Sequence, residues 1–479
     1  MTAPREGCYH HGETRRGIRA PRNEGREALA NLWNPSGASK RKRRKEKPGG
    51  RERTAALFLA ASSSVEKRKR RRMKGKGAPG TARLVRFDPD TATPFGGSGG
   101  EQSFHLIDTT MMFAPRSGGV KRYLTAKRSW LEKHRPDIRQ TLVVPGAHTR
   151  AEGPGLVTVA STRLPFGDGY RMPASVTKWE TVLRVLQPDV IEAGDVFVPG
   201  HAALEAGDAL GVPVVGFCHT DAAALAALHL GDWAEGPTFN FWAQAYSRFD
   251  AVVAPSWHTA SRLSEAGVQH VSVHPLGVDT DLFHPSRGDR ARLLRRTGLP
   301  ADSRLLVFAG RPAREKNIEG MIEAVEKLGD PYRLVLIGAG HGQPYSRQVV
   351  SLDFEREPER LAAIVASCDA FLHANENEIF GLVVLEAMAA GLPVIGPNKG
   401  GVGELIDEAV GQHAATSDPS DLAGAIEALF ARDVRAISET ARRRAVAQHS
   451  WDATFEGLTK LYADLIAKSP RRAPLALTA

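Results

Sequence analysis

The chain is poor in cysteine and contains no long apolar run. Its three cysteines, Cys8, Cys218 and Cys368, are too few and too far apart for a disulfide framework, which favours a reducing compartment. No run of about 18 or more apolar residues occurs, so the sequence excludes a membrane-spanning helix. The apolar stretch 55–61 lies between basic clusters, too far from the start for an ordinary signal peptide. We therefore expect a cytoplasmic protein, with contact at the cytoplasmic face of a membrane left open.

The positive charge of the chain is confined to its first part. The formal net charge is +10, but residues 1–100 hold 25 Lys and Arg against 9 Asp and Glu, and the remainder holds 39 against 45. The body is therefore mildly acidic, and its composition argues against general nucleic-acid binding. Cys8, His10 and His11 lie close together but lack a second ligand pair at zinc spacing, so we expect no metal there.

Residues 1–100 are expected to form a disordered basic leader, because blocks of like charge repel one another and bury little. Three interpretations of the leader stay open. It is a solvated tail, or an upstream extension that is not translated because Met73 is the start, or a tail that holds anionic lipid or RNA.

From residue 103 onward, short apolar runs alternate with helix-like or turn-rich sequence. Such runs indicate buried parallel strands of an α/β sheet. The pattern occurs twice, on either side of a linker rich in Gly, Pro and Asp at 275–289, which predicts two Rossmann-like halves facing across a cleft. The predicted strands are 104–110, 140–146, 155–161, 189–195, 212–220 and 250–256 in the first half, and 304–310, 332–338, 349–354, 368–374 and 392–397 in the second.

The expected domain boundaries follow from this pattern. A first Rossmann-like domain is expected to cover 101–284, and a second 285–449. A terminal helix at 450–468 begins after Ser450, a good N-cap residue, and is expected to cross back to the first domain. The last segment, 469–479, is expected to be a flexible tail.

The most informative segment is 375–397, NENEIFGLVVLEAMAAGLPVIGP. A polar loop presents Glu378 after a strand, and a helix then begins near Phe380 and Gly381. The free N–H groups of a first helical turn attract phosphate, and Gly381 allows a close approach to the backbone. Glu386 lies within the same helix. The two carboxylates are therefore placed to bind different sugar hydroxyls on either side of a phosphate.

A second segment, GRPAREKN at 310–317, follows another predicted strand. Arg311 and Lys316 place two cations where that strand ends, which suits a diphosphate: a guanidinium binds two phosphate oxygens, and an ammonium adds a mobile point charge.

Together, VFAGRPAREKN and ENEIFGLVVLEAMAAGLPVIGPNKGGVGELI resemble the retaining, nucleotide-sugar-dependent glycosyltransferases of family four, which have the GT-B fold. The resemblance continues through APSWHTASRL, PLGVDTDLFHP and the terminal helix, and covers about 104–466.

The resemblance implies roles for individual residues. Glu378 would contact the donor sugar, Glu386 the nucleotide ribose, and Arg311 and Lys316 the diphosphate. Residues of the Phe-Gly-Leu insert would also contact the donor, and Gly119 would close over its phosphate. His219 would face the reacting sugar. Asp221 is a weaker candidate, which would orient that histidine or the acceptor. The implied site residues are His219, Glu378, Arg311 and Lys316 in catalysis, and Gly119, Phe380, Gly381, Leu382 and Glu386 in donor binding.

Asp279 and Asp281 match the Asp-x-Asp signature with which GT-A transferases hold a metal, but they lie in the linker between the predicted halves. We therefore expect no metal and no cofactor, and we expect the two cations and the helix dipole to stabilise the leaving diphosphate. The resemblance also implies that the donor is a nucleotide-diphosphate sugar, bound by the second domain, while the first domain holds the acceptor. The whole-chain pattern favours GDP-mannose and hence an α-mannosyltransferase acting on a lipid-linked or glycan hydroxyl.

Several alternatives stay open at this point. They are a UDP-sugar-dependent transferase of the same fold, a GT-B phosphorylase or nucleotide-sugar epimerase, and a non-enzymatic nucleotide-sugar-binding protein. The basic segment 120–135 carries six Lys and Arg with Tyr123 and Trp130, and is either an ordinary solvated helix or a surface that docks on an anionic membrane.

Overall fold

The computed structural model describes residues 103–115, 117–164, 169–338 and 346–469. The predicted leader at 1–100 and residues 470–479 of the predicted tail lie outside the described residues.

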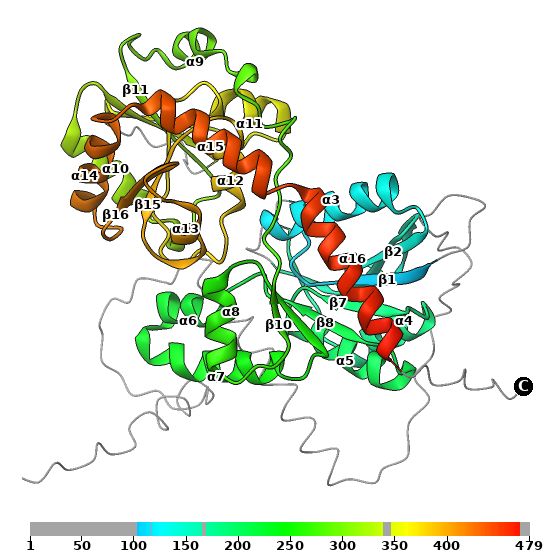
Figure 1. The fold of residues 1–479 in the computed structure, drawn as a ribbon. Coiled ribbons are helices and arrows are strands. Elements are labelled where there is room, and N and C mark those ends of the chain that lie inside the picture. The colour runs from blue at the N-terminus through cyan, green and yellow to red at the C-terminus, as the bar shows by residue number, and fades with distance from the viewer. Residues whose placement is uncertain (1–102, 116, 165–168, 339–345, 470–479) are drawn as a thin grey trace, which may run out of the picture. The chain divides into compact units, whose positions relative to one another are not determined.

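Two largely parallel sheets form the described chain, which confirms the predicted pair of Rossmann-like halves (Figure 1). The first has the order β10-β9-β8-β7-β1-β2-β4-β3, in which only the β3–β4 pair is antiparallel. Its strands are β1 Phe104–Thr109, β2 Ile138–Gly146, β3 Arg150–Gly153, β4 Leu156–Ala160, β7 Val190–Ala193, β8 Val214–Phe217, β9 Ala251–Ala254 and β10 Val271–Val273.

The second sheet is parallel throughout and has the order β13-β12-β11-β14-β15-β16. Its strands are β11 Arg304–Ala309, β12 Tyr332–Ile337, β13 Val349–Leu352, β14 Ala370–Leu372, β15 Val394–Pro397 and β16 Gly411–Ala414. A separate antiparallel ribbon pairs β5, Thr162–Arg163, with β6, Arg171–Met172.

Helices connect the strands of both sheets. Those of the first half are α3 Gly119–His134, α4 Val176–Val185, α5 Val198–Leu210, α6 Ala222–Leu230, the short η2 Asp232–Ala234, α7 Glu235–Tyr246 and α8 Trp257–Glu265. Those after them are η3 Pro285–Arg287, α9 Arg290–Thr297, η4 Arg314–Lys316, α10 Ile318–Leu328, α11 Pro358–Val365, α12 Leu382–Ala389, α13 Gly400–Leu405, α14 Pro419–Phe430, α15 Val434–Gln448 and α16 Trp451–Lys468.

The first sheet is buried on both faces. Successive residues of a strand point to opposite sides, and the neighbours Leu106 and Ile107 of β1 are both fully buried but belong to different hydrophobic clusters. The cluster that contains Leu106 also includes Phe455 and Leu458 of α16 and core residues of the second sheet. Because both faces of the sheet are buried, its strands appear in the sequence as short continuous apolar runs.

The last helix, α16, contacts α3 of the first half (Figure 1, red and cyan). As expected, Ser450 caps it: its hydroxyl accepts a hydrogen bond from the backbone N–H of Ala453 at 3.2 Å. On the predicted apolar face, Trp451 stacks on Phe455 with the ring planes 6° apart. Tyr462, two turns further, is fully buried.

Tyr462 reaches a buried ionic cluster beneath the first sheet's helix α3. The Lys127 ammonium donates to Asp108 at 2.7 Å and to the Tyr462 hydroxyl at 3.0 Å, and it lies 2.9 Å from the Glu192 carboxylate. Tyr462 and Tyr123 donate to Glu192 as well. Each group is almost completely buried, so each depends on the others to replace water.

These contacts change the interpretation of the basic helix α3. Tyr123 and Trp130, the aromatic residues that suggested a membrane-docking face, are buried, and so is Lys127. Arg122 and Arg128 also hydrogen-bond to other parts of the protein. Among the described residues, no helix combines the length and the apolar character needed to cross a membrane.

We predict that Tyr462→Phe lowers the free energy of unfolding by about 1–3 kcal/mol, because it leaves a buried ammonium and a buried carboxylate each short of one hydrogen bond. Urea denaturation of the full chain measures the change. Tyr332→Phe is the matched control: its hydroxyl bonds to the partly exposed Arg304, where water can substitute. A loss at Tyr462 no larger than the loss at Tyr332 would contradict the prediction.

Candidate functional site

Two predicted site residues, Lys316 and Glu378, form an ion pair. Lys316 ends η4 in the loop after β11, and Glu378 lies in the loop after β14. Because β11 and β14 are adjacent parallel strands, both loops leave the same edge of the sheet. The Lys316 Nζ lies 2.5 Å from Glu378 Oε2, and both side chains are mostly buried.

The same carboxylate has two further neighbours that the sequence analysis did not identify. Asn375 donates its side-chain N–H to Glu378 Oε2 at 2.9 Å, and the His373 Nε2 lies 3.8 Å from that oxygen. Burial would raise the pKa of Glu378, but the charge of Lys316 and these polar neighbours outweigh it and lower the pKa to about 2. Glu378 is therefore ionised at any physiological pH.

His373 is fully buried, and neither of its ring nitrogens has a hydrogen-bond partner among the described residues. Burial lowers its pKa to about 4, although Glu378 attracts the charged form. The signal for both missed residues was the polar run HANEN directly after an apolar strand, since polar groups that follow a strand of an open α/β sheet lie on its ligand-binding edge.

Glu386 lies on α12, where its side chain is buried. Its partner is Arg122, on the second turn of α3, and the ion pair joins the two halves. Burial raises the pKa of Glu386, and the charge of Arg122 opposes this only in part. The sequence analysis grouped Arg122 with the basic helix and missed it as a site residue. Its position three residues after Gly119 was the available signal.

The first turns of α3 and α12 lie against each other. A Cβ atom on Gly119, the first residue of α3, would lie 3.4 Å from the Leu382 side chain at the start of α12. Neither helix has a side-chain N-cap. The partial positive charges of two helix N-termini therefore converge, which is a favourable place for an anion.

Gly381 is the residue that allows α12 to begin where it does. Its φ is +96°, in the left-handed region, and a Cβ there would lie 2.8 Å from the Val402 side chain. The flanking Phe380 and Leu382 have buried side chains in the core. Any contact of these two residues with a donor therefore has to come from their backbone groups.

Arg311 lies on the same loop as Lys316 but has a different environment. Its side chain is 54% exposed and its guanidinium is 3.4 Å from Glu315, a residue of that loop. Arg311 is thus available to an incoming anion. Of these two cations, only Lys316 forms an ion pair with Glu378.

His219 follows β8, as predicted, and is held between aromatic rings. It stacks on Phe217 with the centroids 4.1 Å apart, and the Tyr123 ring centroid is 5.0 Å away. Its Nε2 is enclosed and has no hydrogen-bond partner among the described residues. Burial, and to a smaller degree the charge of Lys127, lower its pKa to about 3.

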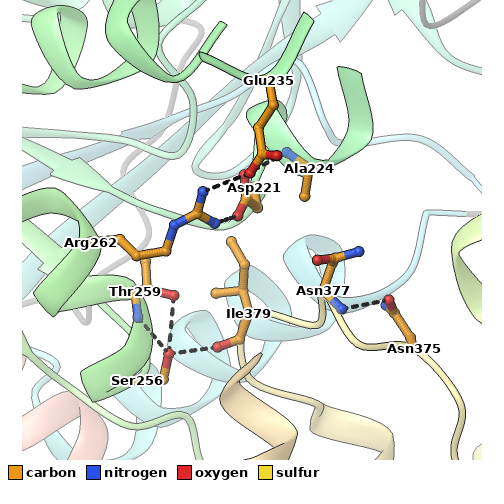
Figure 2. A network of polar contacts seen from close by, with 9 residues as sticks. All are labelled: Asp221, Ala224, Glu235, Ser256, Thr259, Arg262, Asn375, Asn377 and Ile379. Carbon is orange, nitrogen blue, oxygen red and sulfur yellow. Dashed lines mark hydrogen bonds and ion pairs between the residues drawn. The ribbon is translucent and has the colours of Figure 1, made fainter. Parts of the chain in front are cut away.

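The weaker candidate Asp221 serves the fold. One of its oxygens accepts the backbone N–H of Ala224 and caps α6, and the other pairs with Arg262 of α8 (Figure 2). In the linker, the Asp279 carboxylate accepts two backbone N–H groups of its own turn. Within the described residues, no group of three or more metal-ligating side chains was found.

A further contact between the halves holds the Glu378 loop. The Ser256 hydroxyl, which caps α8, donates to the carbonyl of Ile379 at 2.7 Å (Figure 2). Nearby, the Glu404 carboxylate of α13 accepts the backbone N–H groups of Trp257, at 3.0 Å, and of His258. The first half thus fixes the backbone directly after Glu378.

Comparison with known proteins gives two family matches. The model described as "Glycosyltransferase Family 4" matches residues 117–282, and that described as "Glycosyl transferases group 1" matches residues 289–448.

Two curated relatives are similar along most of their length. A GDP-mannose-dependent alpha-mannosyltransferase of Mycolicibacterium smegmatis is 32% identical over 61% of this chain and 78% of its own. One of Corynebacterium glutamicum is 29% identical over 75% of this chain and 88% of its own. Among solved structures, sucrose-phosphate synthase from Thermosynechococcus elongatus has a TM-score of 0.65 at 19% identity, and the match covers 76% of this chain and all of that one. At this level of identity, the similarity to the solved structure supports only the fold.

We predict that Glu378 and Lys316 are coupled by about 1.5–3 kcal/mol of folding stability at pH 7, as expected for a mostly buried, charge-assisted hydrogen bond. A double-mutant cycle with Glu378→Gln and Lys316→Met, measured by urea denaturation, gives this energy. The folded-state pKa of Glu378 lies below its ordinary value of 4.5. The coupling is therefore complete above about pH 4.5 and declines as the pH falls toward 2.

The control cycle uses Glu357 and Arg360, an exposed pair for which about 0.5 kcal/mol or less is expected. Equal coupling in the two cycles, or a Glu378 coupling that is the same at pH 7 and pH 3, would contradict the prediction.

Proposed function

The chain belongs to glycosyltransferase family four and is a transferase of GT-B fold, and from that premise we propose that it transfers mannose from GDP-mannose to a hydroxyl of a lipid or glycan acceptor, with retention of configuration. The observation that carries the proposal is the Lys316–Glu378 pair beside the converging first turns of α3 and α12. The two relatives are GDP-mannose-dependent mannosyltransferases, which favours mannose and a guanine nucleotide over other donors.

In this proposal the diphosphate binds at the two helix N-termini. Lys316 supplies the nearest fixed cation, and Arg311, exposed on the same loop, adds a guanidinium. The backbone at Gly119, Phe380, Gly381 and Leu382 donates to phosphate oxygens.

Glu386 binds the ribose. Its carboxylate is paired with Arg122, and in the proposed complex the two ribose hydroxyls replace that guanidinium as hydrogen-bond donors. The mannosyl ring lies between Glu378 and His219, whose unpartnered Nε2 hydrogen-bonds a sugar hydroxyl.

The reaction breaks the bond between the anomeric carbon and the β-phosphate oxygen, and negative charge develops on that phosphate. Lys316, Arg311 and the helix N-termini stabilise this charge, so we propose that transfer does not depend on a metal. The acceptor oxygen forms its bond on the face from which the phosphate leaves, which retains the configuration. Its proton passes to an oxygen of the departing phosphate, and GDP leaves.

We predict that Lys316→Ala and Glu378→Gln each lower the transfer rate by about 10²–10³, because each removes a charge that faces the reacting groups. The assay measures GDP release with EDTA in the buffer, where the unchanged protein is expected to keep its full rate. Lys327→Ala removes an exposed lysine on α10 that bonds to Ser420, and it serves as the control with an unchanged rate. Wild-type turnover in either site variant, or loss of all activity in EDTA, would contradict the mechanism.

The donor is tested separately from the chemistry. A ligand that binds only the folded state raises its thermal stability, so we expect GDP-mannose and GDP to raise the unfolding temperature more than UDP-glucose, UDP or ADP-glucose. Glu386→Gln is expected to reduce the GDP shift. A larger shift with the uridine nucleotides would replace guanine by uracil in the proposal while leaving the transferase assignment in place.

A further inference from the structure

A cavity of about 470 Å³ lies beside the proposed donor site. One side is the corner formed by the end of α6, η2 and the start of α7, and the other side consists of Arg314 and Asn377. Asn377 precedes Glu378 in the chain, and Arg314 lies two residues before Lys316. Figure 2 shows Ala224 and Glu235 of the first half with Asn377 across from them. None of these lining residues takes part in the donor interactions proposed above.

The lining combines an apolar wall with polar groups. Ala224, Ala227 and Leu228 of α6 form the apolar wall. At its end lies His229, whose Nδ1 is enclosed and has no hydrogen-bond partner among the described residues. Asp232 and the amide of Asn377 also line the cavity. This mixture suits a sugar-like ring, which has apolar C–H faces and a rim of hydroxyls.

An exposed tryptophan lies next to the cavity. Trp233 directly follows the lining residue Asp232, and its side chain is 59% exposed. The indole is fixed in place: its N–H donates to the carbonyl of Leu230 at 2.8 Å, and its ring lies 3.3 Å from where a Cβ of Gly231 would be. A held, exposed indole next in the chain to a lining residue of the cavity offers a face on which the C–H face of a carbohydrate can pack.

The charges at this corner select against an anionic occupant. Arg262 pairs with Asp221 and lies 3.4 Å from Glu235, so one guanidinium serves two carboxylates. Asp232 adds a third acid and Arg314 a second cation, which leaves a net charge of about −1 around the cavity. A phosphate group on the occupant would meet this excess of carboxylates.

We propose that this cavity is the acceptor subsite and that it holds a neutral, polyhydroxylated ring, a glycosyl end group rather than a phosphorylated acceptor. The proposal rests on the proposed function, since Asn377 places the cavity next to the residue assigned to the donor sugar. Trp233 packs on the ring, and His229, Asp232 and Asn377 bind its hydroxyls.

The test measures binding of two probes that share one ring, methyl α-D-mannoside and mannose 6-phosphate. Each is titrated by saturation-transfer NMR into the full chain saturated with the nucleoside diphosphate that stabilises it most. We expect the mannoside to bind and the phosphorylated sugar to bind at least about tenfold more weakly. Asp232→Asn is expected to reduce the difference in affinity between the two probes, because it removes a carboxylate that repels the phosphate.

The tryptophan is tested with matched variants. Trp233→Ala is expected to weaken mannoside binding about tenfold, and Trp233→Phe to restore most of it. Trp257→Ala removes an exposed tryptophan that is not adjacent in the chain to any lining residue, and it is the control with unchanged binding.

The thermal shift with the nucleotide, measured on every variant, separates the two proposals. Three results would show that the acceptor subsite is wrong while the donor site stands, provided that the nucleotide stabilises the protein. They are no binding of the mannoside, tighter binding of the phosphorylated sugar than of the mannoside, and equal mannoside binding by the Trp233→Ala and Trp257→Ala variants. If no nucleotide stabilises the protein, the proposed function itself fails.

Discussion

The ion pair between Lys316 and Glu378 is the interaction on which the site depends, and it follows from the order of the strands. The two loops that carry these residues leave adjacent parallel strands, β11 and β14, at one edge of the second sheet. Because both side chains are mostly buried, each needs the other's charge to offset its loss of water. The carboxylate is therefore ionised and held in position by its protein partners, as its proposed role in orienting a donor sugar requires.

Glu386 has a partner of a different kind, and the difference matters for how a donor enters. Its cation, Arg122, is 45% exposed and comes from the first half of the chain, whereas Lys316 is 18% exposed and comes from the same sheet as Glu378. An exposed guanidinium regains water when it leaves the pair, so the proposed exchange of Arg122 for ribose hydroxyls would cost less than separating Lys316 from Glu378. In that proposal the exchange also removes an ion pair between the halves, which would link donor binding to the contact between them.

The sequence predicted those parts of the fold in which local pattern and burial agree. Strands at the sheet centres are continuous apolar runs, and Ser450 caps the last helix as its residue type suggests. The edge strands β3, β10 and β16 were missed, because an edge is less buried and GQHA in β16 carries no β-branched residue. Pairings across the chain were not predictable either: nothing in a run of basic residues indicates that Lys127 turns inward to Asp108 and Glu192 while Arg122 reaches Glu386. The assigned roles of all the predicted site residues stay predictions: Gly119, His219, Arg311, Lys316, Glu378, Glu386 and the Phe-Gly-Leu insert.

The two histidines near the site bear on where the acceptor proton goes. Burial lowers the pKa of His219 to about 3 and that of His373 to about 4, so both rings are neutral at pH 7. A general base works best when its pKa lies near the working pH, and a group that titrates three or four units lower accepts a proton poorly in the transition state. Glu378, with its pKa of about 2 and its oxygen already engaged by Lys316, is weaker still. In the proposed reaction the departing phosphate becomes more basic as its bond to the sugar breaks, and retention of configuration places it next to the attacking hydroxyl. The environment of these side chains keeps the imidazoles neutral and the carboxylate ionised, so it supports the proposed proton transfer to the leaving group over one to the protein.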